Sequence, residues 1–421
     1  MEEMPVFTND AVVFGLLMIS LGFVFYTSSI KTGFWAKFYK IVPGVLMCYL
    51  IPAILNSAGL IDSSVSNLYF VASRYLLPAS LVLMTLSIDL KAIFNLGPKA
   101  LIMFFAATIG IIIGGPIAIL LISAVSPDTV GGAGFDATWG GLSTLAGSWI
   151  GGGANQAAML EIYRYNPEKY GGMVLVDIVV ANLWMAIVLL GVGKSDRIDK
   201  WLQADNSAIT QLKDKVSAYS ESVKRIPSLA DFMIILALAF GAVGIAHFGA
   251  DEISSFLVST FDVFQDKKSS LASFSSEFFW MITIATAIGI LLSFTKFKQY
   301  EGAGASKIGS IFIYILVATI GMKMDLGAVF DNPGLIAIGL VWMTIHVIIL
   351  LVTAKLIKAP YFFLAVGSQA NVGGAASAPV VAAAFHPSLA TVGVLLAVFG
   401  YVVGTYGAIL CTILMQLASG S

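Results

Sequence analysis

Two short stretches of similar composition decide the fold of this chain: GSWIGGGANQAAM, which begins at Gly147, and GSQANVGGAASAP, which begins at Gly367. Each places glycines, a serine and carboxamide side chains inside a long apolar segment. Glycine lowers helix stability by about 1 kcal/mol relative to alanine, so both stretches favour local unwinding. Paired interruptions in corresponding positions of two hydrophobic halves are typical of the substrate site of a secondary transporter.

The composition predicts that the chain lies in a lipid bilayer. Of its 421 residues 58% are hydrophobic and 11% charged, and the mean hydropathy is +0.92. A helix needs about 20 apolar residues to cross a bilayer core, and short alternating strands typical of a barrel do not occur. The sequence therefore predicts an all-α polytopic membrane protein with twelve candidate segments: 11–28, 41–61, 67–88, 98–124, 140–163, 170–193, 229–249, 276–295, 306–324, 334–357, 361–385 and 388–417.

Several kinds of chemistry are excluded by the residues that are rare. Cys48 and Cys411 both lie in apolar segments, so a disulfide framework is not expected. His247, His346 and His386 are far apart and form no metal-binding pattern. The net charge of −1, without a basic cluster, argues against a nucleic-acid partner, and no phosphate-binding loop is present. We expect no cofactor, and an ion gradient as the source of energy.

The only long polar stretch divides the chain into two membrane halves, 1–193 and 229–421, joined by residues 194–228. Its mixed charges and few apolar residues predict a solvated linker with one surface helix. A regulatory or partner-binding element is the alternative interpretation.

The two halves have related sequences. The stretches from Gly147 and Gly367 align without gaps, and upstream SIDLKAIFNLGP resembles MKMDLGAVFDNP, with Asp89 and Leu90 aligned to Asp325 and Leu326. Both matches occur in the same order, which predicts an internal duplication.

Loop charges predict that the two copies are inverted. Lysine and arginine favour cytoplasmic loops, and the basic loops at 31–40, 91–99 and 164–169 change sides relative to those at 296–307 and 355–358. Twelve crossings divided evenly would give parallel copies instead. Inversion thus requires one crossing more or fewer between about 194 and 275, where 251–265 could form a short or re-entrant piece. We expect twelve to thirteen crossings.

Candidate substrate and ion ligands surround both interruptions. Unwound backbone can bind ions, and half-helix N-termini favour anionic groups. Close packing of helices through small residues is the alternative explanation for the glycines, but not for the amides. The candidates are Ser148, Gly152, Gly153, Asn155 and Gln156 in the first copy, and Ser368, Gln369, Asn371, Gly373, Gly374 and Ser377 in the second.

Asp177 is the candidate ligand for Na⁺ or H⁺. It lies in the apolar segment that follows the first interruption, where a carboxylate is costly unless it faces water, an ion or a partner. Asn182 is a further polar candidate in the same segment. Arg74 stands inside an apolar segment, where it could neutralise an anionic substrate, pair with Asp177 or extend to the membrane surface.

These motifs resemble those of the YjcL-like family of bacterial membrane proteins of unknown function, over essentially the whole chain. That family is similar, more distantly, to the superfamily of sodium/proton antiporters and of bile-acid and glutamate sodium symporters. The resemblance implies a sodium/proton-antiporter-like fold, with inverted repeats, two broken helices that cross at mid-membrane in a core domain, and a panel domain that often forms a dimer. It also implies an elevator-like movement of the core and a location in the bacterial cytoplasmic (inner) membrane.

By position, Asp177 is similar to the ion-binding aspartates of the antiporters. The chain lacks their adjacent second aspartate, and it has Tyr401 and Thr405 where some relatives carry a lysine. Sodium-coupled uptake of a small organic solute, with an anion favoured, fits the amide-rich interruptions better. A cation/proton antiporter is the second hypothesis. An intramembrane enzyme or receptor is the third, for which no nucleophile and base, metal spacing or signalling domain is found.

Overall fold

The computed structural model describes residues 6–39, 42, 44–61, 66–86, 93–94, 96–205, 226–262, 276–324, 332–386 and 389–420. The described residues are almost entirely helical, and no strand occurs among them. The aligned Asp89–Leu90 and Asp325–Leu326 pairs lie outside the described residues.

Helices occur at all twelve expected segments. They are α1 (Asp10–Ser29), α3 (Gly44–Ser57), α4 with η1 and α5 (Leu68–Val71, Ala72–Leu76 and Leu77–Leu86), α7 (Pro98–Ser123), α8 (Thr138–Tyr163), α9 (Tyr170–Val192), α12 (Leu229–Thr260), α13 (Glu277–Ser293), α14 (Ala305–Gly321), α15 (Gly334–Leu356), α16 with α17 (Tyr361–Val372 and Gly374–Phe385) and α18 (Ala390–Ser419). Short helices α2 (Gly33–Phe38), η2 (Pro127–Val130), η3 (Gly134–Asp136), α10 (Ser195–Leu202) and η6 (Lys296–Ala303) connect them.

The number of membrane crossings is not confirmed. Among the described residues, seven helices are long and apolar enough to cross a bilayer, or eight if α13 and η6, bent by 98°, form one span. The helices α3 and α14 are shorter, and α16 and α17 are two short helices rather than one long one. The 26-residue helix α8, rich in glycine and polar residues, is not among the seven either.

Residues 251–260 form the end of α12 rather than a separate re-entrant piece. A capping box at Ser228 and Asp231 starts this helix, and it continues for 32 residues. At 1.5 Å per residue it is about 48 Å long, which exceeds the roughly 30 Å of a bilayer core. Residues 263–265 of the same stretch lie outside the described residues.

The described part of the linker includes the predicted surface helix, α10. Leu202 is fully buried, and Asp199 accepts a hydrogen bond of 2.7 Å from the backbone N–H of Tyr361, at the start of α16. Residues 206–225 lie outside the described part of the chain. The beginning of the linker is therefore attached to the helix that carries the second glycine stretch.

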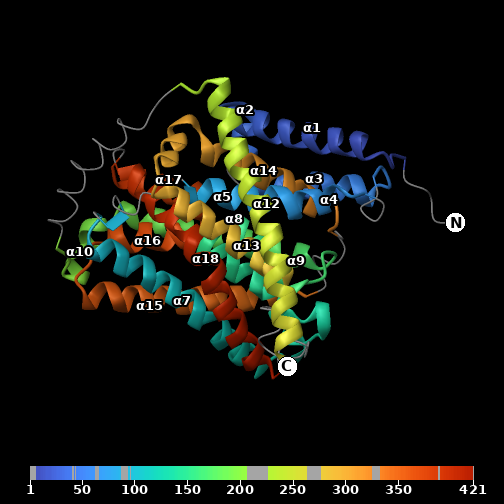
Figure 1. Cartoon of the computed structure of the whole chain (residues 1–421). Coiled ribbons are helices and arrows are strands. Elements are labelled where there is room, and N and C mark those ends of the chain that lie inside the picture. The colour runs from blue at the N-terminus through green and yellow to red at the C-terminus, as the bar shows by residue number, and fades with distance from the viewer. Residues whose placement is uncertain are drawn as a thin grey trace.

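The helices form two groups, each built from both halves of the sequence. The first contains α1, α3, α5, α12, α13 and α14, and the second contains α7, α8, α9, α15, α16, α17 and α18. In Figure 1, α1, α3, α5 and α14 lie above α7 and α15, and α12 runs steeply from the top of the view to near its lower end. Contacts within each group are much more extensive than those between them, where α5 meets α8 and α18 and α13 meets α8. This division places a boundary through the middle of the molecule.

Candidate functional site

Both glycine stretches contain an interruption of the helix, as the sequence predicts. Within α8, Gly152 has φ +75° and ψ −173°, which only glycine adopts readily. In the second stretch α16 ends at Val372, and Gly374, with φ +56°, begins α17. A Cβ atom added to Gly374 would lie 3.8 Å from the Cα of Gly152. The two interruptions therefore face each other, although their depth in a membrane and their inverted relation remain predictions.

Other glycines in the two stretches serve close helix packing. A Cβ on Gly151 would lie 2.7 Å from the Cα of Gly404 in α18, and one on Gly367 would lie 3.1 Å from the backbone of Met103 in α7. These glycines let neighbouring helices approach at backbone distance, which is the small-residue packing weighed above. Gly152 and Gly374 thus interrupt the helices, whereas Gly151 and Gly367 allow neighbouring helices to pack closely.

A cavity of about 690 Å³ lies between the two helix groups and includes both interruptions in its wall. The first group contributes residues of α1, α3, α5 and α14, among them Ser28, Tyr49, Met84 and Tyr314. The second group contributes most of the sequence-predicted candidates: Ser148, Gly152, Gly153, Gln156, Asp177, Asn182, Gln369, Gly373, Gly374, Ser377 and Tyr401.

Asp177 of α9 lies on the cavity wall and accepts three hydrogen bonds from α8. Ser148 Oγ donates to Oδ2 at 2.7 Å, and Gln156 Nε2 donates to the same oxygen at 3.2 Å. Trp149 Nε1 donates to Oδ1 at 2.7 Å. Three neutral donors hold the carboxylate in place, yet none of them neutralises its charge. Sequence reasoning missed Trp149, because a tryptophan in an apolar segment gives no signal beyond packing.

The electrostatics of the cavity favour a cation. Asp177 is the only charged side chain among the described residues that line it. No group of three or more metal-ligating side chains occurs in the described part of the chain, so a transition-metal site has no support there. Carboxylate and hydroxyl oxygens are ligands for hard cations, and Asp177 with Ser148 supplies both. These residues could hold Na⁺, or Asp177 alone could carry a proton.

The second interruption carries a polar pair of its own. Ser377 Oγ donates to Gln369 Oε1 at 2.9 Å. The amide nitrogen of Gln369 is buried and has no hydrogen-bond partner among the described residues. Both side chains line the cavity. The amide is thus fixed at its oxygen end while its donor end has no acceptor.

Four predicted candidates hold helices together away from the cavity. Asn155 donates to the Gly151 carbonyl at 2.8 Å and accepts from Thr405 of α18. Asn371 donates to the Phe104 carbonyl at 3.2 Å, and Ser368 lies 2.8 Å from His346 Nε2. These four residues, Asn155, Ser368, Asn371 and Thr405, do not line the cavity.

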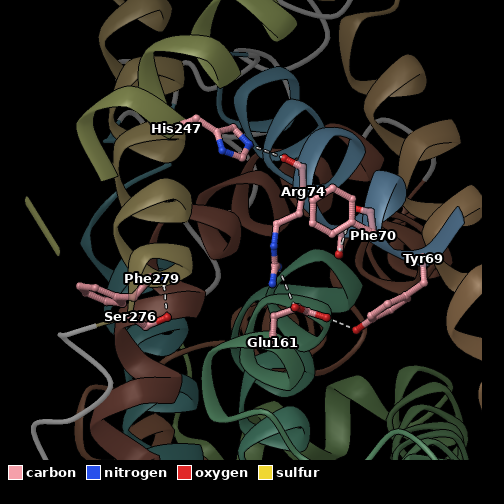
Figure 2. Close-up of polar contacts among 8 residues, drawn as sticks. Tyr69, Phe70, Arg74, Glu161, His247, Ser276 and Phe279 are labelled. Carbon is pink, nitrogen blue, oxygen red and sulfur yellow. Dashed lines mark hydrogen bonds and ion pairs between the residues drawn. The ribbon is translucent and has the colours of Figure 1, made fainter. Parts of the chain in front are cut away.

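Arg74 pairs with a residue that the sequence did not suggest. Its Nη1 lies 2.7 Å from Oε2 of Glu161, near the end of α8, and the hydroxyl of Tyr69 donates to the other carboxylate oxygen. Arg74 also lies over the ring of Phe278 in α13, 4.5 Å from its centroid. Figure 2 shows the Arg74 and Tyr69 side chains converging on Glu161. Arg74 therefore does not pair with Asp177, and its ion pair joins the two helix groups.

The backbone at Arg74 is irregular for a recognisable reason. Residues Ala72–Leu76 form a π-helical turn, and Pro78 has no N–H to give to the Arg74 carbonyl four residues earlier. The Nε2 atom of His247 in α12 lies 2.9 Å from that carbonyl (Figure 2), and since a carbonyl only accepts, Nε2 donates. At this π-turn the Arg74 side chain contacts α8, and the Arg74 carbonyl accepts a hydrogen bond from α12.

Comparisons with known proteins agree with this picture of a membrane protein. A family model described as "Protein of unknown function (DUF819)" matches residues 15–417. The chain is also similar to the uncharacterized membrane protein YjcL of Bacillus subtilis (strain 168), with 23% identity over 398 residues that cover 91% of this chain and 93% of that protein.

Proposed function

Because this chain belongs to the DUF819 family, whose description assigns no activity, we propose its function from the cavity: it is an ion-coupled secondary transporter of a small organic solute. The observation that carries the proposal is the position of the cavity. It lies between two helix groups, and both helix interruptions and Asp177 form part of its wall.

This arrangement suits alternating access by an elevator-like movement. Contacts between the groups are few compared with those inside each, so one group can slide along the other without losing its own core. The predicted polar ligands of the cavity all belong to the second group, and the first group contributes mainly apolar residues. The second group is therefore the proposed carrier of ion and solute, and the first is the proposed scaffold.

Asp177 is the proposed site of ion coupling. No positive side chain among the described lining residues balances the Asp177 carboxylate. A bound cation would therefore offset the free-energy cost of holding this negative charge in a poorly solvated cavity. The same cation compensates the charge of an anionic solute bound beside it. Sodium is the proposed ion, because the Asp177 carboxylate and the Ser148 hydroxyl that contacts it offer oxygen ligands.

The test begins with binding, since the solute is unidentified. Purified full-length protein is screened by thermal shift against amino acids, peptides and organic acids, in NaCl and in choline chloride. A ligand whose stabilisation requires sodium is then followed into liposomes that contain the protein, with and without a sodium gradient. The proposal predicts sodium-driven uptake. Ligand binding and uptake that are equal in both salts would contradict it.

A cation/proton antiporter is the second candidate, favoured by Asp177 as the single charged side chain among the described residues of the cavity wall. Liposomes loaded with a pH-sensitive dye distinguish the two functions. An antiporter moves protons when NaCl or KCl alone is added, whereas a solute symporter requires the organic solute.

The proposed location is the cytoplasmic (inner) membrane of a bacterium, and the proposed assembly is a homodimer formed through the first helix group. Mass measurement of the protein in native-like lipid discs tests the assembly.

A further inference from the structure

The cavity wall at the second interruption has two features that select for a hydrogen-bond acceptor. The first is Gln369, which is 1% exposed, lines the cavity, and has an amide nitrogen with no acceptor among the described residues. A buried amide donor without a partner costs free energy, so a ligand that supplies an acceptor gains from it.

The second feature is the N-terminus of α17. This 12-residue helix begins at Gly374 on the cavity wall, and no side chain caps it. The first N–H groups of a helix have no partner within the helix, and the helix dipole adds partial positive charge there. Gln369 and Ser377, hydrogen-bonded to each other, flank this terminus from both sides of the break.

The rest of the wall determines what kind of acceptor fits. No lysine, arginine or histidine occurs among the described lining residues, so only neutral donors and the helix terminus are offered to an anion. Much of the remaining surface is aliphatic or aromatic, including Phe25, Val45, Ile178, Ile313 and Val372. A ligand with several charges would lose its hydration against this surface without compensation.

We propose that the α16–α17 interruption binds the carboxylate of an organic monoacid whose remaining part is apolar. Gln369 and the N-terminal amides of α17 bind the carboxylate, and the aliphatic wall takes the hydrocarbon. This inference rests on the proposed transport function and specifies its substrate class. A cation at Asp177 then balances the one negative charge of the acid.

Two matched pairs of probes test the inference by direct binding: hexanoate against hexanamide, and benzoate against benzamide. Each pair has nearly the same shape and differs in charge. Isothermal titration of the full-length protein in NaCl should show each acid binding about tenfold or more tightly than its amide, as expected for a hydrogen bond to a charged group.

Two variants of Gln369 locate the subsite. Gln369→Glu keeps the shape and the acceptor for Ser377 but brings a negative charge, so it should abolish acid binding and retain amide binding. Gln369→Leu should remove the preference for acid over amide. Gln416→Leu, in α18 away from the cavity, is the control and should behave as the unmodified chain. Thermal unfolding shows that each variant is folded.

The outcomes separate this inference from the transport proposal. The carboxylate subsite would be overturned if the acids bind no more tightly than their amides, or if the affinity for acids is unchanged in Gln369→Glu. This holds whether or not binding depends on sodium. Acid binding that depends on Gln369 but is indifferent to sodium would support the subsite and contradict the proposed coupling.

Discussion

Trp149 donates a 2.7 Å hydrogen bond from its indole N–H to Oδ1 of Asp177. The indole also packs edge-on against Trp342 of α15, with 5.1 Å between ring centroids. The charged group of the cavity is therefore fixed to the aromatic core of the second helix group. Any ion that binds Asp177 changes the surroundings of an intrinsic fluorophore.

Asp177→Asn should abolish the response of the protein to sodium while the chain stays folded. The amide keeps the shape of the side chain but lacks the charge that would hold Na⁺ or H⁺. The measurement is the rise in thermal midpoint, and the change in tryptophan fluorescence, on replacing choline chloride by NaCl. Asp136→Asn, which removes the η3 carboxylate that does not line this cavity, is the control. An unchanged sodium response in Asp177→Asn would place the ion site elsewhere.

Gly152→Ala should destabilise the protein by about 1–3 kcal/mol, because its backbone conformation is one that alanine adopts only with strain. Gly153→Ala is the matched control one residue later. Its Cβ would come no closer than 3.9 Å to a neighbouring atom, and its φ is not positive. We expect the control to be neutral or slightly stabilising in thermal unfolding, since alanine is the better helix former. Equal losses of stability at both positions would show that the backbone conformation of Gly152 is not the cause of the loss.

The Arg74–Glu161 pair should show a coupling of about 0.5–3 kcal/mol in a double-mutant cycle, as groups in direct contact do. Arg74→Leu leaves a carboxylate in a largely buried place, with a side-chain exposure of 11% and, among the described residues, Tyr69 as its remaining hydrogen-bond donor. Glu161→Gln alone should cost less, because the amide oxygen still accepts from Tyr69. The double variant should recover part of the loss caused by Arg74→Leu. Additive effects on the free energy of unfolding would mean that the pair contributes nothing.

The contact between η3 and the start of α9 should loosen in acid. Hydrogen bonds from Lys169, at 2.9 Å, and from Asn166 lower the pKa of Asp136. A carboxyl group whose pKa is lower in the folded state stabilises the fold above its unfolded pKa of about 3.9, and this contribution is lost as the pH falls through the lower folded value. Hydrogen exchange at the Asn166 N–H, which donates to the Phe135 carbonyl, is the local probe. In Lys169→Gln, the pH at which exchange of this N–H begins to accelerate should be higher, because the pKa of Asp136 is then lowered less. If this pH is the same in Lys169→Gln, the ion pair with Lys169 is not the reason why the contact is lost in acid.

The sequence predicts the two helix interruptions, because glycine clusters in an apolar segment are costly features that need a reason. Asp177 lies on the wall of the cavity that includes both interruptions, while its role as an ion ligand stays a prediction. The sequence cannot predict Glu161 as the partner of Arg74, since the two are 87 residues apart and no local pattern links them. Nor does it separate Asn155 and Asn371, which hydrogen-bond to Thr405 of α18 and to the Phe104 carbonyl of α7, from Gln156 and Gln369, which reach the cavity. The four amides have the same chemistry and differ only in the direction that the tertiary structure gives them.

The contact between Gly151 in α8 and Gly404 in α18 has a consequence for biosynthesis. Neither helix group can be completed from the first half of the chain, because each contains helices from both halves. During synthesis, α8 must remain in the membrane without its main neighbour until α18 emerges from the ribosome. The cavity, whose wall includes Tyr401 of α18, therefore cannot be completed before α18 is made, and a chain truncated before α18 would expose the glycine face of α8 to lipid or to quality-control proteases.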